Sequence, residues 1–292
     1  MDDLAGKVAV ITGGGSEFGI GRATGKLLAE HGMKLALADI NADALEQTVK
    51  DLTGQGFEVI GIPTDVSDFA SMQNLAAETY QAYGKANVVF LNAGIGGGGS
   101  LFDDDMSGWD RVIGINFLGV LHGIKAFVPR MIESGEPGHV LATSSGAGTT
   151  GVMYTGPGYA VTKQAVLTLM ECLYGQLRDQ GVDIKASTVF PPLTRTNLAG
   201  TPEVMDMVVS GLASSGIPAV AGEPDEVALV VLDAIQSGSF WAHQTVEQDE
   251  RQTEGRMKPM ILWEDEIVRA QADSKINRTA PDPYLWGGSG RS

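Results

Sequence analysis

Short runs of consecutive apolar residues alternate along this chain with longer stretches in which apolar residues recur at every third or fourth position. The short runs are typical of strands buried on both faces, and the longer stretches are typical of helices with one apolar face. Strands are predicted at residues 8–11, 35–38, 59–62, 88–91, 139–143 and 184–189. Helices are predicted between them at residues 21–31, 42–52, 67–83, 106–133 and 158–178.

This alternation predicts an α/β fold, because parallel strands need crossover helices that cover both faces of the sheet. We expect a doubly wound parallel sheet of the Rossmann type in a single domain over residues 1–292. After the sixth predicted strand the regular alternation of strands and helices ends. Residues 191–222 contain a predicted helix at 204–212. Ligands bind at the carboxyl ends of such strands, so 191–222 is expected to be a substrate lid. Residues 241–292 are expected to form a C-terminal extension with a helix at 260–273.

The formal net charge of −16 argues against nucleic acid or an anionic membrane as partner. Binding to phosphate groups needs clustered Lys and Arg, which this chain lacks. No segment is expected to approach the ~18 apolar residues needed to span a bilayer, and the N-terminus has no basic region before an apolar run. We therefore expect a cytoplasmic protein.

The single cysteine, Cys172, excludes an intramolecular disulfide framework. It stands in a helical pattern where a small buried apolar residue is expected. The four histidines are too dispersed to form a metal site, so catalysis without a metal is expected.

A glycine-rich turn from Thr12 to Gly21 separates the first predicted strand from the first predicted helix. Glycines let the backbone approach a pyrophosphate, and the helix N-terminus offers N–H groups and the positive end of its dipole. Asp39 ends the second predicted strand, where a carboxylate accepts hydrogen bonds from the adenosine ribose hydroxyls. A 2′-phosphate would be repelled there, which favours NAD over NADP. Alternatively, Asp39 caps the next helix, a role that Asn41 can also fill.

Tyr159 is followed four residues later by Lys163, and Ser144 and Ser145 precede both. Residues four apart share one face of a helix, so the Lys163 ammonium is expected near the Tyr159 phenol, where it would favour the phenolate. A phenol with its usual pKa of ~10 is a poor base near neutrality. Ser145 would hold the substrate oxygen by a hydrogen bond. The set indicates proton exchange between Tyr159 and an alcohol or ketone while a nicotinamide exchanges the hydride.

With these residues the chain resembles the short-chain dehydrogenase/reductase family from residue 7 to about residue 240. The resemblance implies a metal-free, NAD-dependent alcohol dehydrogenase or ketoreductase. The catalytic residues that it implies are Asn116, Ser145, Tyr159 and Lys163. The cofactor-binding residues that it implies are Gly13, Ser16, Phe18, Gly19, Ile20, Gly21, Asp39, Ile40, Asp65, Val66, Asn92, Ala93, Gly94, Tyr159, Lys163, Pro191, Thr194 and Thr196.

The same resemblance implies roles for single residues. Asp65 and Val66 would contact the adenine, and residues 92–94 would line the cofactor cleft. Asn116 would anchor a proton-relay water through a distortion of its helix. Lys163 would also bind the nicotinamide ribose, and Thr196 the carboxamide. Assembly as a homotetramer or homodimer would use the two long helices at 106–133 and 158–178.

The chain departs from the family pattern at three places. The glycine-rich turn is two residues longer than usual, so Glu17 is expected to point to solvent. The serine spacing is one residue longer than usual, which leaves the choice between Ser144 and Ser145 open. Pro192 stands where a glycine is usual and stiffens the exit from the sixth strand.

The longer turn, the stretch 127–132 and the extended C-terminus resemble a subgroup that includes bacterial Cα-dehydrogenases of lignin-type β-aryl ethers and dehydrogenases of bulky secondary alcohols. The apolar lid candidates suit a hydrophobic or aromatic alcohol or ketone. They are Met153, Leu198, Met205, Met207, Val208 and Trp241. Two other functions stay open: an NAD-binding regulator or scaffold without turnover, and a lyase or epimerase that uses the same tyrosine.

Overall fold

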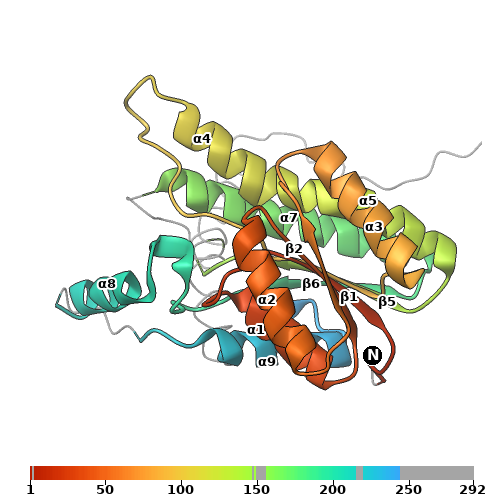
Figure 1. The fold of residues 1–292 in the computed structure, drawn as a ribbon. Coiled ribbons are helices and arrows are strands. Elements are labelled where there is room, and N and C mark those ends of the chain that lie inside the picture. Colours follow the sequence, from red (N-terminus) through yellow and green to blue (C-terminus); the bar gives the residue numbers. More distant parts are fainter. Residues whose placement is uncertain (2, 147, 149–155, 215–219, 244–292) are drawn as a thin grey trace, which may run out of the picture.

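A seven-stranded parallel sheet forms the centre of the molecule (Figure 1) in the computed structural model, which describes residues 1, 3–146, 148, 156–214 and 220–243. The strand order is β3-β2-β1-β4-β5-β6-β7. The strands are β1 (Val8–Thr12), β2 (Lys34–Asp39), β3 (Val59–Pro63), β4 (Val88–Leu91), β5 (Gly138–Thr143), β6 (Ile184–Val189) and β7 (Trp241–Ala242). The strand order reverses where β1 pairs with β4, so the crevice for a ligand is expected at the carboxyl ends of these two strands.

The central strands are largely apolar because their side chains enter packed layers on both faces of the sheet. Along β1, Val10 belongs to one core cluster, while Ala9 and Ile11 belong to the other. This follows from the two-residue period of a strand. Every residue of β1, β4 and β5 is buried. The uninterrupted apolar runs in the sequence therefore predicted the strands correctly.

Helices cover both faces of the sheet, which confirms the doubly wound α/β fold (Figure 1). One face is covered by α1 (Ile20–Glu30), α2 (Ala42–Gly54) and α9 (Pro224–Ser237). The other face is covered by α3 (Phe69–Tyr83), α5 (Gly119–Ser134) and α7 (Pro157–Gln180).

The predicted helix at 106–133 is continuous but changes its pitch. It consists of α4 (Ser107–Val112), a π-helical segment (Ile113–Leu118) and α5. By length and composition alone, Ser107–Ser134 is apolar enough to cross a membrane, with a mean hydropathy of 1.5 in its most apolar window. The expectation that no segment approaches this limit was therefore wrong. Part of this apolar surface packs into the core, since Val120, Phe127 and Met131 of α5 are buried in the core cluster.

The sequence analysis did not predict α9 or β7. Yet α9 carries clear boundary signals: Glu223 and Glu226 form a reciprocal capping box, Pro224 opens the helix, and Gly238 ends it with a φ of 73°. The helix could therefore have been predicted from these residues. The strand β7 has only two residues, which is too short for a periodic pattern to reveal.

The segment predicted as a lid leaves β6 through a 3₁₀-helix (Asn197–Ala199) and continues as α8 (Pro202–Ser214), which confirms the helix predicted at 204–212. Arg195 connects this segment to α8 and to the start of α9 by two ion pairs. Its Nε donates to Asp206 Oδ1 at 2.8 Å, and its Nη1 donates to Glu223 Oε1 at 2.6 Å. The lid candidate Met153 and the helix predicted at 260–273 lie outside the described residues.

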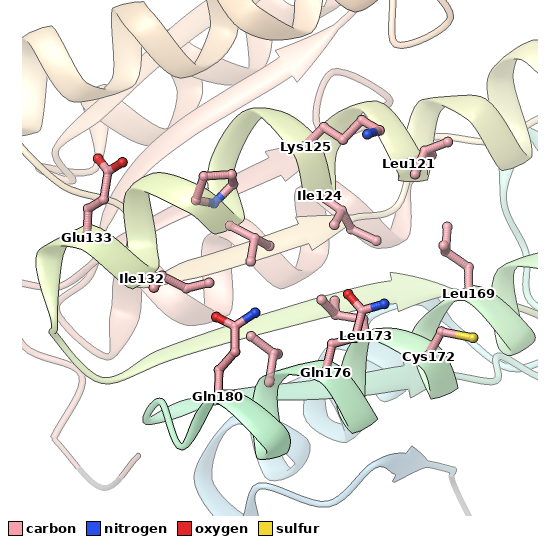
Figure 2. Close-up of a pocket in the computed structure, with 13 residues that line it drawn as sticks. Leu121, Ile124, Lys125, Ile132, Glu133, Leu169, Cys172, Leu173, Gln176 and Gln180 are labelled. Atoms are coloured by element: carbon pink, nitrogen blue, oxygen red, sulfur yellow. The ribbon is translucent and has the colours of Figure 1, made fainter. Parts of the chain in front are cut away.

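A groove of about 570 Å³ runs along the outer side of the molecule between α5 and α7 (Figure 2). Cys172 lines this groove and is exposed, so the expectation of a buried cysteine was wrong. The next residue, Leu173, is 7% exposed and belongs to the core cluster. The helical pattern was correct, but Cys172 stands on the groove side of α7.

Candidate active site

The glycine-rich turn after β1 passes very close to β4 and to the start of α1. Gly13 has a φ of 71°, a left-handed value that favours glycine. A Cβ on Gly21 would collide with the Gly13 carbonyl oxygen and would lie 2.9 Å from the Asn92 amide nitrogen. No side chain caps the N-terminus of α1 at Gly19. The turn therefore leaves its backbone and the positive end of a helix dipole available to an anion, and Glu17 is exposed, as expected.

The Asp39 carboxylate is held by two backbone N–H groups. Its Oδ2 accepts a hydrogen bond from Gly15 at 2.9 Å, and its Oδ1 accepts one from Asn41 at 3.0 Å. Asn41 is the residue that caps α2, since its Oδ1 accepts a hydrogen bond from the Ala44 N–H at 3.1 Å. The structure thus assigns the cap of α2 to Asn41 and holds the Asp39 carboxylate against the glycine-rich turn, while its contact with a ribose stays a prediction.

A hollow of about 350 Å³ lies beside the crevice between β1 and β4. The predicted cofactor-binding residues that line it are Gly13, Asp39, Ile40, Asp65, Val66, Ala93 and Gly94. Asp65 is oriented by Ser67, whose N–H and hydroxyl both donate to Asp65 Oδ1, at 2.9 and 2.6 Å. Asp110 and Arg111 of α4 also line the hollow, and the sequence analysis assigned them no role.

The other predicted cofactor residues do not line this hollow. Ser16 is on the turn, where its hydroxyl accepts a hydrogen bond from Asn197 at 3.1 Å, and Phe18 beside it is 46% exposed. Gly19, Ile20 and Gly21 form the start of α1. Pro191, Thr194 and Thr196 follow β6, and Thr196 Oγ1 caps the 3₁₀-helix.

Asn92 connects the carboxyl ends of β1, β4 and β5 by hydrogen bonds. Its N–H and the N–H of Ala93 both donate to Thr12 Oγ1, at 2.9 and 3.1 Å. Its Oδ1 accepts a hydrogen bond from the Thr143 hydroxyl at 3.0 Å. Thr12 and Thr143 were not singled out from the sequence, although a hydroxyl residue at the carboxyl end of a buried strand is a signal that could have found them.

The three side chains predicted for proton transfer meet just beyond β5. The side chains of Ser145 and Tyr159 are hydrogen-bonded, and Lys163 Nζ lies 5.6 Å from the centre of the Tyr159 ring. Lys163 is only 3% exposed, and its Nζ donates to the Thr143 carbonyl at 2.9 Å. The Ser144 hydroxyl instead donates to the Lys163 carbonyl at 2.8 Å. Of the two serines left open, Ser145 is therefore the one that reaches Tyr159.

The acidity of the site differs from the expectation. Burial raises the pKa of the Tyr159 hydroxyl, and the hydrogen bond with Ser145 lowers it to a smaller extent. Burial also lowers the pKa of Lys163 to about 8. The pKa of Tyr159 is thus raised overall instead of lowered as expected, because a dry environment disfavours charge on both groups. Tyr159 is therefore protonated at neutral pH.

Asn116 lies in the π-helical segment, as expected from the predicted distortion of its helix. Its Oδ1 accepts a hydrogen bond from the Ile95 N–H at 2.8 Å, and its Nδ2 donates to the Ile95 carbonyl at 2.9 Å. The same Nδ2 donates to Thr162 Oγ1 at 3.2 Å, and this hydroxyl donates to the Tyr159 carbonyl at 2.8 Å. Thr162, which the sequence analysis missed, thus connects Asn116 to the helix that carries Tyr159.

Comparisons with known proteins agree with this arrangement. Residues 7–204 match the sequence profile described as short chain dehydrogenase. A C alpha-dehydrogenase of Sphingobium sp. (strain NBRC 103272 / SYK-6) is 36% identical over 200 residues, which cover 68% of this chain and only 64% of that relative. The crystal structure of a short chain dehydrogenase/reductase from Burkholderia phymatum in complex with NAD has a TM-score of 0.75 at 33% identity, covering 97% of this chain and 99% of that chain. A metagenomic short-chain oxidoreductase in complex with NADP has a TM-score of 0.66 at 28% identity, covering 82% of this chain and 96% of that chain.

Proposed function

Because the chain belongs to the short-chain dehydrogenase family, we propose that it is an NAD-dependent oxidoreductase that interconverts a bulky hydrophobic secondary alcohol and its ketone. The observation that carries this proposal is the hydrogen bond between Ser145 and Tyr159 beside the buried Lys163 ammonium. These groups hold a proton at one defined place next to the hollow between β1 and β4.

Tyr159 exchanges the proton in this proposal. In reduction its protonated hydroxyl donates to the carbonyl oxygen as that oxygen gains negative charge, and in oxidation the phenolate accepts the proton of the alcohol. Ser145 donates a hydrogen bond to the same oxygen and so fixes its position. The Lys163 ammonium stabilises the phenolate whenever it forms. A bound nicotinamide supplies the hydride donor or acceptor.

The residues of the hollow fit a dinucleotide. Gly13 and Gly21 let the turn pack closely against residues 92–93 and against itself. The uncapped start of α1 beside this turn offers N–H groups to a diphosphate. Asp39 presents a carboxylate to ribose hydroxyls. We propose NAD as the cofactor, since the lining holds the carboxylates of Asp39, Asp65 and Asp110 against one cation, Arg111. A 2′-phosphate would meet net negative charge there.

The segment 191–222 is proposed as the substrate lid. Leu198, Met207 and Val208 expose 41%, 66% and 40% of their surface. Apolar side chains exposed on a lid favour an apolar ligand. Met205, at 7% exposed, packs inside the lid instead. These observations support a hydrophobic or aromatic substrate over a small polar one.

Replacement of Tyr159 tests the proposal directly. The change Tyr159→Phe should abolish the interconversion of aryl secondary alcohols and ketones, measured by absorbance of the reduced nicotinamide, and should leave NADH binding intact. Tyr174→Phe is the matched control, since Tyr174 is 37% exposed on the same helix. Turnover retained in Tyr159→Phe contradicts the proposal. Binding of NADH without consumption by any alcohol or ketone in the wild type indicates a scaffold, and turnover without net formation of NADH indicates a lyase or epimerase.

We further propose that the chain assembles in the cytoplasm as a homotetramer or homodimer of single-domain subunits. The groove between α5 and α7 supports this, because apolar residues line it along α5 and along the second half of α7 (Figure 2). Lys125 and Glu133 on α5 also line the groove, and a two-fold axis between them would pair each with its opposite charge. Ile132→Glu should therefore shift the mass measured by light scattering toward the monomer. A wild type that is monomeric at assay concentration contradicts this assembly.

A further inference from the structure

The start of α7 is tied to the segment that leaves β4. The Gly97 carbonyl accepts a hydrogen bond from the Tyr159 N–H at 3.0 Å, and the Gly156 carbonyl lies 3.1 Å from the same nitrogen. The first N–H groups of a helix have no partner one turn before them within the helix. The backbone of the proposed acid-base residue is therefore held by a different part of the chain.

Gly98, which follows Gly97, is in contact through its backbone with Gly158, which precedes Tyr159. A Cβ on Gly98 would lie 2.5 Å from the Gly158 Cα, and a Cβ on Gly158 would lie 2.7 Å from the Gly98 Cα and 2.9 Å from Val112 Cγ1. Packed carbon atoms normally stay about 3.5–4.0 Å apart. Gly98 also has a φ of 116°, which side chains rarely adopt. Neither position has room for even a methyl group.

The segment is fixed at its other end as well. Ile95 exchanges two hydrogen bonds with the Asn116 side chain, at 2.8 and 2.9 Å. The stretch 95–98 therefore runs from the side chain of Asn116 to the turn of α7 that carries Tyr159. A shift of this stretch relative to α7 would move Tyr159 relative to Asn116 and to Ser145.

We propose that Gly98 and Gly158 are positioning residues whose backbone contact sets the place of the Tyr159 hydroxyl against Ser145. The inference rests on the proposed function, because it concerns the residue assigned to proton transfer there. A methyl group at either glycine has to separate the two backbones by roughly an ångström to reach ordinary contact. Neither glycine lines the hollow, although Ile95 of the same segment does, so the main effect is expected on proton transfer and only a small one on cofactor binding.

The kinetic test compares Gly158→Ala and Gly98→Ala with Gly175→Ala. Gly175 is in the same helix, and a Cβ there would meet nothing within 4 Å. Because a misplacement of about 1 Å can cost about 10²-fold in rate, both contact variants should lose about that factor in kcat. Their Kd for NADH, from nicotinamide fluorescence, should stay within about twofold of the wild type, as expected when only orientation changes. Gly175→Ala should keep the wild-type kcat.

A second readout needs no substrate. The pKa of Tyr159 can be measured from the near-ultraviolet absorbance as a function of pH. The absorbance of the Tyr159→Phe counterpart of each protein is subtracted, so that only Tyr159 contributes. The contact variants should shift this pKa from its wild-type value, because the hydrogen bond with Ser145 is altered, and Gly175→Ala should not. If the wild type turns over no alcohol or ketone, the proposed function fails, and this titration alone decides the positioning role.

The inference is overturned if both contact variants match Gly175→Ala in kcat and in the pKa of Tyr159. Circular dichroism establishes that each variant folds. Should Gly158→Ala fail to fold, Gly98→Ala provides the test, since it alters a segment outside both core clusters rather than the helix.

Discussion

The Ser144 hydroxyl donates a hydrogen bond to the Lys163 carbonyl at 2.8 Å, and Ser144 is 1% exposed. This contact joins the end of β5 to the second turn of α7. The neighbouring hydroxyl of Ser145 is directed to Tyr159 instead. Two adjacent residues of the same type therefore stand in different environments, and their substitution should have different consequences.

Ser145→Ala should lower kcat by roughly 10²-fold, because the reacting oxygen loses an oriented hydrogen-bond donor. Ser144→Ala should keep most of the activity and lower the free energy of unfolding by about 1–3 kcal/mol, because the buried Lys163 carbonyl loses its side-chain donor. Steady-state kinetics and urea unfolding separate the two effects. The reverse pattern, with the larger kinetic loss in Ser144→Ala, would show that the serine assignment is wrong.

The pH dependence of the two reaction directions should be opposite. Since burial raises the pKa of Tyr159, the protonated phenol that reduction requires is present at neutral pH, and the phenolate that oxidation requires forms only in alkali. The kcat/KM for alcohol oxidation should therefore rise with pH, by up to about tenfold per unit below that pKa.

The same profile should move further toward alkali in Ser145→Ala, because the hydrogen bond that lowers the pKa of Tyr159 is removed. The measurement is kcat/KM for oxidation from about pH 7 to about pH 10. An oxidation rate that does not change over this range would argue against Tyr159 as the base.

Cofactor preference should depend on Asp39, whose carboxylate is held by the N–H groups of Gly15 and Asn41. Asp39→Ala should raise KM for NAD and lower the ratio of kcat/KM for NAD to that for NADP by roughly 10-fold or more, because repulsion of the 2′-phosphate is relieved. Asp43→Ala, on the first turn of α2, is the control for a change of net charge alone. An unchanged ratio in Asp39→Ala would remove the reason for choosing NAD.

Stability should fall in mild acid because of His139. This residue of β5 is 1% exposed, its Nε2 lies 2.6 Å from Ser187 Oγ, and burial lowers its pKa from 6.5 to about 3. The neutral form stabilises the fold fully above pH 6.5, and this stability is lost as pH falls from there toward the folded-state pKa. The loss is about 1.4 kcal/mol for each pH unit.

The free energy of unfolding in urea, measured at about pH 7.5 and about pH 5.5, tests this dependence. His139→Gln should reduce the difference between the two values, although it lowers stability at both. His31→Gln, at an exposed histidine, should leave the difference as it is in the wild type. Equal pH dependence in all three proteins would rule out His139 as its source.

Several features could be predicted because they depend on residues close together in the chain. The spacing of Tyr159 and Lys163 places both on one helix face, whatever the rest of the fold does. The turn from Thr12 to Gly21 lies between a strand and a helix that are both visible in the apolar pattern. The start of α9 is also encoded locally, by the capping box of Glu223 and Glu226 around Pro224.

Other features depend on how distant segments pack. The choice between Ser144 and Ser145 depends on which hydroxyl meets α7, and the pKa of Tyr159 depends on how much of the phenol is buried. Neither the serine that meets α7 nor the burial of the phenol can be read from a local sequence pattern. Cys172 shows the same limit, since a helical period predicts that one face is buried but not which residues face a groove.

The sequence by itself determined the alternation of strands and helices, the glycine-rich turn and the shared helix face of Tyr159 and Lys163, because each follows from backbone periodicity over a few residues. Only the tertiary structure decided that Ser145 faces Tyr159, that burial raises the pKa of that phenol, and that Gly98 packs against Gly158. These depend on desolvation and on contact between atoms of segments that are remote in the chain, and such contacts exist only once the sheet and its helices are assembled.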